Sequence, residues 1–314
     1  MPVLYLVLPC YNEEEVLPET AKRLKARLAE LIESGRCDKG SRIMFVDDGS
    51  KDRTWEIITE LFSNNECFCG IKLAHNRGHQ YALLAGLMTA ANYCDCCISM
   101  DADLQDDIDV LDDFMDEYAK GCDVVYGVRK KRTTDTAFKR ITAQGFYRFM
   151  KLLGVDVVYN HADYRLMSRR ALEALAEYKE YNLFLRGIVP LIGFKSSCVY
   201  YERHERFAGE SKYPLKKMLS FAINGISSFS VKPIHLISNL GIIISALSIF
   251  GMLYALISKL TGFAASGWTA IVASIWLIGG IQLFCLGIIG EYIGKIYSEA
   301  KARPKYTIEE FLKK

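Results

Sequence analysis

Before about residue 230, short apolar runs alternate with longer segments whose apolar residues recur at helical spacing. Short runs of this kind are typical of strands that are buried on both faces of a parallel sheet. They predict strands over residues 3–8, 42–47, 68–74, 96–100 and 124–126. Because strands and helices alternate, we expect an α/β fold with a mostly parallel sheet flanked by helices.

The helices between these strands are predicted from apolar stripes. The first should start near Asn12, which together with Glu15 has the spacing of a capping box. Further helices are expected through residues 55–61 and 81–91. The core-facing stripe of the first helix consists of Ala21, Leu24, Leu28 and Leu31.

After about residue 230 the pattern changes to two long runs without Asp, Glu, Lys or Arg, at 234–257 and 269–290. Each exceeds the roughly 20 apolar residues that cross a bilayer as a helix. A buried helix of a soluble protein is the alternative for one such run, but two in tandem favour a transmembrane hairpin over 234–294. Residues 214–233 have the spacing of an amphipathic helix lying in the membrane interface, although a core-facing helix has the same pattern.

Basic residues flank the predicted hairpin on both sides, and cationic flanks stay on the cytoplasmic side of a membrane. No basic leader precedes the first apolar run, so we expect no signal peptide. We therefore predict a plasma (inner) membrane protein with both termini cytoplasmic. Its parts would be a catalytic domain over 1–213, the interfacial helix, the hairpin, and a cytosolic tail over 295–314.

Composition narrows the function. The formal net charge is +2 with 24% charged residues, without the concentrated basic face that is typical of nucleic-acid-binding proteins. The ten cysteines show no paired C-x-x-C spacing. In a protein facing the cytosol they should be reduced and should fill the core rather than bind zinc.

Three predicted strands end in polar residues, at 9–13, 47–50 and 101–105. Ligands of open α/β sheets bind beyond the carboxyl ends of the strands, so these segments should line one site. Asp101 and Asp103 offer hard oxygen ligands for Mg²⁺ or Mn²⁺, which would also hold a substrate diphosphate. The chain has no G-x-G-x-x-G and no P-loop sequence. It therefore lacks the phosphate-binding loops of Rossmann dehydrogenases and of P-loop NTPases.

Six segments occur in the order P-C-Y-N-E-E, V-D-D-G-S, N-R-G-H-Q-Y-A-L-L-A-G, D-A-D-L-Q, A-D-Y-R-L-M-S-R-R and R-F-A-G-E-S-K-Y-P. Together they resemble family-2 glycosyltransferases of the GT-A fold. Within that family the chain is most similar to the polyprenyl-phosphate branch, which includes bactoprenol glucosyltransferases and dolichyl-phosphate mannose synthases. The likeness runs from residue 3 to about residue 295, and the predicted hairpin is closest to the bactoprenol type.

The resemblance implies a role for each matched position. Asp101, Asp103 and Gln105 would hold the metal, and Asp101, Asp103, Asp163 and Arg206 would be catalytic. The donor nucleotide would be bound by Pro9, Tyr11, Glu13, Val46, Asp48, Asp101, Ala102, Asp103 and Gln105, with Asp48 reading the base. The acceptor phosphate would be bound by Arg129, Lys139, Arg140, Arg206 and Lys212, although Ala143 stands where the family often has a serine.

Structural alternatives remain open for several of these residues. Asp47 and Asp48 with Gly49 have the composition of a turn and helix cap. Asp163 has Arg165 and Arg169 as possible ion-pair partners. The basic run 129–132 could be a solvated face, and His75 and His79 are interpreted as loop-shaping groups rather than metal ligands.

The activity implied by the resemblance is inverting transfer of one hexose from UDP-glucose to undecaprenyl phosphate at the cytosolic membrane face, as a step of cell-envelope glycosylation. UDP-N-acetylhexosamine and GDP-mannose are alternative donors, and a tetrameric homo-oligomer is implied. A processive polysaccharide synthase normally carries Q-x-x-R-W, which this chain lacks. A non-catalytic nucleotide-sugar-binding membrane scaffold is the alternative from another functional class.

Overall fold

A computed structural model describes residues 1–130, 161–180, 183–202 and 267–314, together with scattered positions between 234 and 257. Its contacts divide the chain into two compact units. The first consists of Met1–Tyr147, Asp156–Tyr213 and Arg303–Lys314, and the second of Arg148–Val155 and Pro214–Ala302. Every element described below belongs to the first unit except helix α10.

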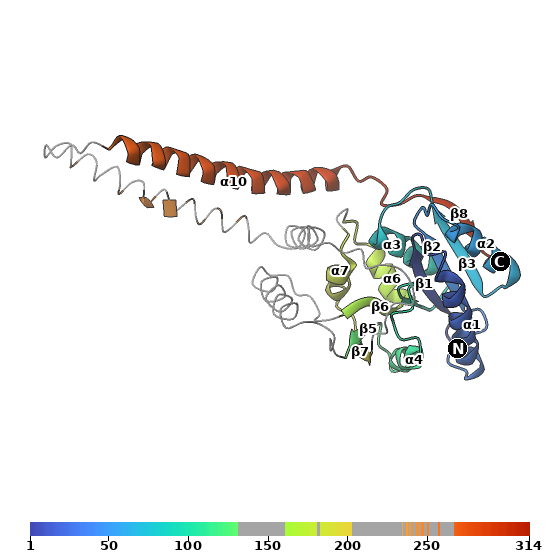
Figure 1. The fold of residues 1–314 in the computed structure, drawn as a ribbon. Helices are drawn as coiled ribbons and strands as arrows, with labels where there is room; N and C mark the ends of the chain where they lie inside the picture. The colour runs from blue at the N-terminus through green and yellow to red at the C-terminus, as the bar shows by residue number, and fades with distance from the viewer. Residues whose placement is uncertain are drawn as a thin grey trace. The chain divides into compact units, whose positions relative to one another are not determined.

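The strands of the first unit form one mixed sheet in the order β7-β5-β6-β4-β1-β2-β3-β8 (Figure 1). Neighbours in the central block β4-β1-β2-β3 are parallel, as the sequence predicts. Strand β6 is antiparallel to β4 and β5, β7 is parallel to β5, and β8 is antiparallel to β3. The strand bounds are Leu4–Cys10 (β1), Arg42–Asp47 (β2), Phe68–Leu73 (β3), Cys96–Ser99 (β4), Val124–Arg129 (β5), His161–Ser168 (β6), Ser196–Tyr201 (β7) and Ile308–Leu312 (β8).

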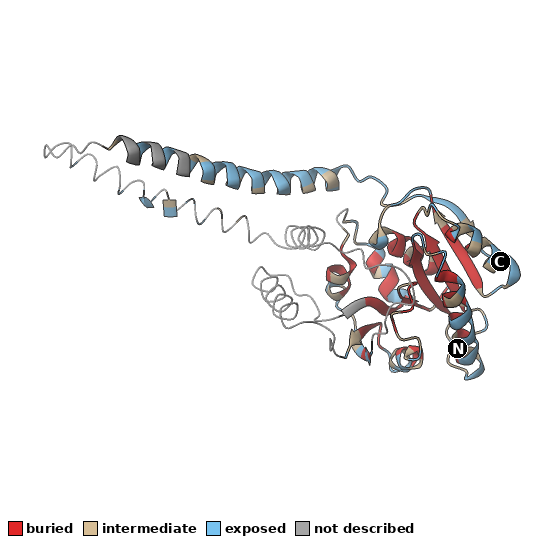
Figure 2. Ribbon diagram, viewed as in Figure 1, coloured by how far each residue is buried: buried red, intermediate tan, exposed pale blue. Residues whose placement is uncertain are grey.

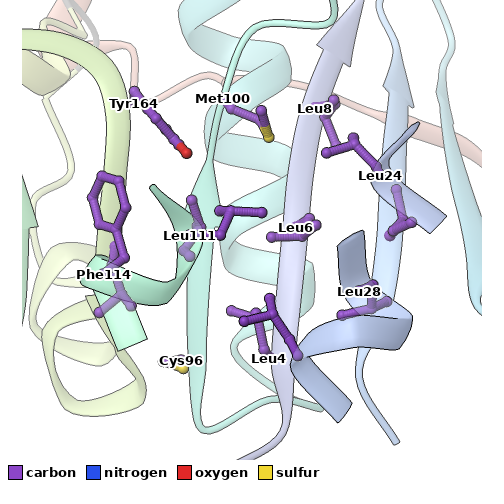
Figure 3. Packing of buried hydrophobic residues seen from close by; sticks show 14 of the residues in the cluster. Leu4, Leu6, Leu8, Leu24, Leu28, Cys96, Met100, Leu111, Phe114 and Tyr164 are labelled. Atoms are coloured by element: carbon purple, nitrogen blue, oxygen red, sulfur yellow. The ribbon is translucent and has the colours of Figure 1, made fainter. Parts of the chain in front are cut away.

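Helices cover both faces of the central strands. On one face Leu4, Leu6 and Leu8 of β1 belong to the same buried cluster as Leu24 of α1 and Phe114 of α4 (Figure 3). The helix bounds are Leu17–Glu33 (α1), Thr54–Asn64 (α2), His79–Ala90 (α3), Leu111–Ala119 (α4), Arg169–Ala176 (α6), Leu185–Leu191 (α7) and Trp268–Ala300 (α10).

Helix α3 packs very closely on the opposite face of the sheet. A Cβ added at Gly86 would lie 2.4 Å from Cγ1 of Val7 and 2.8 Å from Cγ2 of Val46. Both valines are fully buried in neighbouring strands. Glycine is therefore favoured at this position, because a larger side chain would force α3 or the two valines to shift.

The predicted helix cap at Asn12 is wrong. Helix α1 begins at Leu17, and its N-cap residue Val16 makes no side-chain cap hydrogen bond. Asn12 instead has a positive φ of 54°, a conformation that asparagine tolerates better than most residues. Its amide donates to Oγ of Ser50 at 3.0 Å, and its Oδ1 accepts from the amide of Lys51 at 2.9 Å. Asn12 thus joins the loop after β1 to the loop after β2.

The ten cysteines all fall within the described residues and are free. Cys10, Cys37, Cys94, Cys96 and Cys97 are among those buried in the core. Burial raises the pKa of several of these thiols, including those of Cys96 and Cys97. Seven of the ten are buried, as expected for cysteines that fill the core, whereas Cys198 is exposed and Cys67 and Cys285 are partly exposed.

The second unit contains α10, which includes the second predicted membrane run. Its described apolar side chains are largely exposed, in contrast to the buried central strands (Figure 2). Within the part of the chain that the structure describes, no helix meets the length and apolarity needed to cross a membrane. The interfacial helix predicted over 214–233 and most of the run 234–257 lie outside the described residues.

The chain after α10 returns to the sheet as β8, where Ile71 is paired with Phe311. The sequence predicted only a tail over 295–314 and no strand within it. Strands β6 and β7 were also not predicted. As a result, the sheet is more mixed than the mostly parallel one that we expected.

Candidate active site

The three polar strand ends lie at one edge of the sheet, because β1 pairs in parallel with both β2 and β4. A hydrogen bond joins the ends of β1 and β2 directly, and another ties the turn after β4 to α1. The amide of Asp48 donates to the carbonyl of Cys10 at 2.9 Å. Oγ1 of Thr20, on α1, donates to the carbonyl of Ala102 at 2.8 Å. The structure therefore brings the segments at 9–13, 47–50 and 101–105 together.

Asp48 is buried, and the loop after β3 holds both of its carboxylate oxygens. The amide of Arg77 donates to Oδ1 at 2.7 Å, and the amide of Gly78 donates to Oδ2 at 2.8 Å. Burial raises the pKa of Asp48, and these two amide hydrogen bonds oppose the rise. The carboxylate has a fixed orientation, which is what recognition of a nucleotide base would require.

Asp47 beside it plays a different part. It is fully buried, and its Oδ1 accepts from the amide of Ser50 at 3.2 Å. Burial raises the pKa of Asp47, whereas the hydrogen bonds from Ser50 lower it. Asp47 therefore stabilises the turn that was one of the alternatives for these residues. Asp48 is held instead by the separate loop after β3.

Asp101 and Asp103 lie on the turn that follows β4. Oδ1 of Asp103 accepts from the amide of Gln105 at 3.2 Å, and the side chain of Asp101 keeps an exposed fraction of 34%. Leu104 has a φ of +57°, which costs an ordinary residue about 1–2 kcal/mol. Its side chain is buried, so packing holds the strained turn in place.

Asp163, on β6, is the centre of an ionic cluster beside Asp101. Nε and Nη2 of Arg186 donate to its two oxygens, each at 3.1 Å. Nε2 of Gln80 donates to Oδ2 at 3.2 Å. Nε2 of His79 lies 3.6 Å from Oδ2 of Asp163 and 3.7 Å from Oδ1 of Asp101, so the imidazole bridges the two carboxylates.

The charged groups in this cluster shift one another's pKa values. Burial alone would raise the pKa of Asp163, but Arg186 and His79 hold it well below its usual range, so the carboxylate is ionised. Burial lowers the pKa of His79, but the hydrogen bond to Asp163 and the charge of Asp101 outweigh this effect and raise it. Partial burial raises the pKa of Asp101, and the carboxylates of Asp163 and Asp103 add to the rise. The charge of His79 lowers the pKa of Asp101 but does not cancel these effects.

One of the two ion-pair partners considered from the sequence is found, and neither is the strongest partner of Asp163. Nη2 of Arg165 forms a long ion pair with Oδ1 of Asp163 at 3.9 Å, whereas Nη2 of Arg169 pairs with Asp95 at 3.3 Å. The bidentate partner is Arg186, on α7. This arginine was not identified from the sequence, where nothing in its local pattern marks it.

A second buried carboxylate, Asp106, directly follows the D-A-D-L-Q segment. The hydroxyl of Tyr201 donates to its Oδ1 at 2.5 Å. Nη2 of Arg129 is 3.9 Å from the same oxygen, and Nε of Arg129 donates to the Tyr201 hydroxyl at 3.3 Å. Burial and the nearby Asp101 raise the pKa of Asp106 to about 6. Arg129 is thus held at the end of β5 rather than on a solvated face.

The remaining predicted donor-site residues differ in exposure. Pro9, Val46 and Ala102 are buried, with Val46 packed against α3. Tyr11 is exposed. The amide of Glu13 donates to Oγ1 of Thr54 at 2.9 Å, which ties its loop to the start of α2. The predicted acceptor-phosphate residues Lys139, Arg140, Arg206 and Lys212 lie outside the described residues.

Sequence reasoning missed Gln80, Arg186, Asp106 and Tyr201, and it gave His79 only a loop-shaping role. His79 and Gln80 lie within the N-R-G-H-Q segment, so the motif itself was a usable signal. Asp106 directly follows D-A-D-L-Q in the sequence, whereas Arg186 and Tyr201 become neighbours of the site only through strand and helix packing. In the described part of the chain, no group of three or more His, Cys, Asp and Glu residues is arranged to hold a metal ion.

Comparison with known proteins identifies the family. The model of "Glycosyl transferase family 2" matches residues 5–176. The glycosyltransferase YkoT of Bacillus subtilis is 58% identical over 98% of this chain and 91% of the relative. A prophage bactoprenol glucosyl transferase homolog of Escherichia coli is 37% identical over 98% of this chain and 99% of the relative. The bactoprenol glucosyl transferase of Shigella phage SfV is 36% identical over 97% of each chain.

Among solved structures, mannosyl-3-phosphoglycerate synthase from Rubrobacter xylanophilus is a weaker match, with a TM-score of 0.48, 15% identity and 71% of each chain covered. The family match spans more than half of the chain, and the relatives are similar over nearly their whole length. Taken with the polar edge of a mixed α/β sheet, these matches show that the chain belongs to glycosyl transferase family 2 and is a glycosyltransferase.

Proposed function

We propose that the protein transfers a single hexose from UDP-glucose to undecaprenyl phosphate, with inversion at the anomeric carbon. The observation that carries this proposal is the pair of carboxylates on one turn, Asp101 and Asp103, at the edge where β1, β2 and β4 end. The choice of acceptor is supported by the likeness to proteins named bactoprenol glucosyl transferase. UDP-N-acetylhexosamine and GDP-mannose are the alternative donors.

Asp101 and Asp103 fit a hard divalent cation such as Mg²⁺ or Mn²⁺, because carboxylate oxygens are the preferred ligands of both. Burial and the carboxylates of Asp163 and Asp103 raise the pKa of Asp101, and a cation beside it would act in the opposite direction. Gln105 follows on the same turn and would complete the protein side of the site. When bound, the cation would neutralise the negative charge of the departing nucleoside diphosphate.

A phosphate acceptor needs charge neutralisation more than it needs a general base. Its second pKa is near 6, so it carries about −1.5 to −2 charge at neutral pH. Arg129 and Arg186 are cations of the described part that lie near the Asp101 edge. Asp163, kept ionised by Arg186 and His79, would orient Arg186 rather than accept a proton. Lys139, Arg140, Arg206 and Lys212 complete the proposed phosphate site by resemblance.

A polyprenyl acceptor does not leave the bilayer, so we place the catalytic domain against the cytoplasmic face of the plasma membrane. The charge-free runs 234–257 and 269–290 and the basic flanks support a hairpin anchor. The exposed apolar side chains of Ile275, Leu283 and Phe284 on α10 are consistent with apolar surroundings. We also propose an interfacial helix over 214–233 and assembly as a homo-tetramer.

The test is transfer by the full-length protein in detergent, with labelled UDP-glucose, a short-chain polyprenyl phosphate and Mn²⁺. Mass spectrometry should detect a lipid that carries one hexose. Asp103→Asn should lower the transfer rate at least about 100-fold, because the diphosphate charge is no longer neutralised. The matched control is Asp113→Asn, which replaces an exposed carboxylate on α4.

Normal turnover by Asp103→Asn in EDTA-treated buffer would refute the metal role. A product that carries many sugars would point to a processive synthase. UDP-N-acetylhexosamine and GDP-mannose are tested in the same assay. If none of the three donors gives a lipid product, the proposed pairing of donor and acceptor is wrong.

A further inference from the structure

The segment that directly follows α10 in the chain runs along the loop between β3 and α3. We call residues 303–307 the C-terminal brace and residues 75–78 the Asp48 loop. Nε of Arg77 donates to the carbonyl of Lys305 at 2.8 Å, and Nη2 of Arg77 donates to the carbonyl of Pro304 at 3.1 Å. The amide of Ala74, just before the loop, donates to the carbonyl of Thr307 at 3.0 Å. One side chain of the Asp48 loop therefore spans two backbone carbonyls of the brace.

The same loop fixes the orientation of Asp48 with two backbone amides, those of Arg77 and Gly78. It also packs directly on the residue after Asp48. A Cβ added at Gly49 would lie 2.7 Å from the amide nitrogen of Asn76 and 2.9 Å from the carbonyl carbon of His75. The position of the loop and the position of the Asp48 carboxylate are thus mechanically linked.

The brace is held on its other side as well. Nζ of Lys305 donates to the carbonyl of Tyr178, just after α6, at 2.9 Å. The brace then continues into β8, which pairs with β3. The guanidinium of Arg77 also lies 5.6 Å from the centre of the Tyr81 ring on α3. A chain of contacts therefore runs from Tyr178 through Lys305 and Arg77 to Asp48.

We propose that the C-terminal brace positions the Asp48 loop for recognition of the donor nucleotide, with Arg77 and Lys305 as positioning residues. The inference rests on the proposed function only in taking Asp48 as the group that faces the base. Through this contact the brace would affect how tightly the nucleotide binds, although the brace itself does not contact the nucleotide. The contacts between the brace and the Asp48 loop do not include Asp101 or Asp103.

The test compares Arg77→Met and Lys305→Met with Lys313→Met in the full-length protein. Lys313 is the matched control, because its ammonium lies over the Tyr93 ring near the end of the same C-terminal segment. Calorimetric titration with UDP should show a dissociation constant raised about tenfold by Arg77→Met and about threefold by Lys305→Met, since each loses hydrogen bonds of a charged donor. Turnover at saturating donor should stay within about twofold, because the reacting groups are unchanged.

Hydrogen exchange of the peptide covering residues 74–81 gives a readout that does not depend on activity. Exchange should be faster in Arg77→Met and Lys305→Met than in the wild type and Lys313→Met, because the amides of Arg77 and Gly78 are less well held on Asp48. The double variant Arg77→Met/Lys305→Met should lose less UDP affinity than the product of the two single effects, since both act through one contact.

Arg77→Lys separates geometry from charge. A lysine cannot span two carbonyls as the guanidinium fork does, so it should restore little of the lost affinity. Weaker UDP binding in Arg77→Met with unchanged exchange of the 74–81 peptide, or no effect of Lys305→Met, would overturn the proposal. If the wild type binds no UDP, the proposed donor is wrong, while the exchange comparison still decides whether the brace holds the loop.

Discussion

Replacing Asp106 by asparagine tests the electrostatics of the carboxylate that lies behind the Asp101–Asp103 turn. Asp106 is buried, with its Oδ1 bonded to the Tyr201 hydroxyl, and its Oδ2 has no hydrogen-bond partner among the described residues. Burial and the charge of Asp101 raise its pKa from 3.8 to about 6. Folding therefore disfavours the ionised form of this group.

The sign of the effect follows from linkage. Below pH 3.8 the carboxyl is protonated in both folded and unfolded chains, so no stability is lost. As the pH rises toward 6, the unfolded chain ionises first and stability falls. A rise in pKa from 3.8 to about 6 corresponds to about 3 kcal/mol lost above pH 6. About 2 kcal/mol of this change falls between roughly pH 4.5 and 7.

An asparagine side chain does not ionise, so Asp106→Asn should lack this part of the pH dependence. We expect the stability of the variant relative to the wild type to increase by about 2 kcal/mol between roughly pH 4.5 and 7. That is about 4–8 °C in unfolding temperature for a chain of this size. A constant offset from the buried amide does not alter this slope.

The assay is denaturant unfolding of the full-length protein in detergent, followed by tryptophan fluorescence across this pH range. EDTA is present so that no divalent cation changes the charge near Asp101 and Asp103. Asp113→Asn, on the exposed side of α4, controls for removal of a surface carboxylate. Parallel pH profiles for the wild type and Asp106→Asn would mean that Asp106 is ionised throughout, and would refute the reasoning.

Three further predictions concern other contacts. Arg186→Met should lower kcat/KM for transfer about 10–100-fold, because Asp163 loses its bidentate partner, and Arg186→Lys should restore little of it; full activity in the methionine variant would contradict this. Ser168→Ala should destabilise the fold by about 1–2 kcal/mol in denaturant unfolding, since its hydroxyl caps α6 at the amide of Ala171, and transfer per folded molecule should not change. Gly86→Ala should cost about 1–3 kcal/mol by overpacking, and an unchanged unfolding midpoint would show that α3 can shift at no cost.

Local pattern was enough to predict the strands β1 to β5, the helices α1 to α3, and the position of the polar segments at strand ends. A buried parallel strand is a short apolar run, and its carboxyl end must share an edge with its parallel neighbours. Those two facts alone place Asp48, Asp101 and Asp103 at one edge of the sheet. The start of α1 was not predictable in this way, because Asn12 does not cap the helix. It forms hydrogen bonds that join two loops.

Partner choice depended on the tertiary structure. Asp163 had arginines two and six residues away in the sequence, yet its bidentate partner is Arg186, because packing of α7 on β6 brings the guanidinium fork to the carboxylate. Similarly, burial raises the pKa of Asp106, and its hydrogen-bond partner Tyr201, which opposes the rise, lies on a strand that the sequence did not reveal.

The sequence by itself thus determined the central strands, the charge-free runs after residue 230 and the residue types available for chemistry. These follow from periodicity and composition, which act over a few neighbouring residues. Only the tertiary structure decided that β8 returns to the edge of the sheet and that Arg77 reaches the brace. The sequence I-E-E-F-L can pair with any open strand edge, and which edge it finds depends on contacts between residues more than two hundred positions apart.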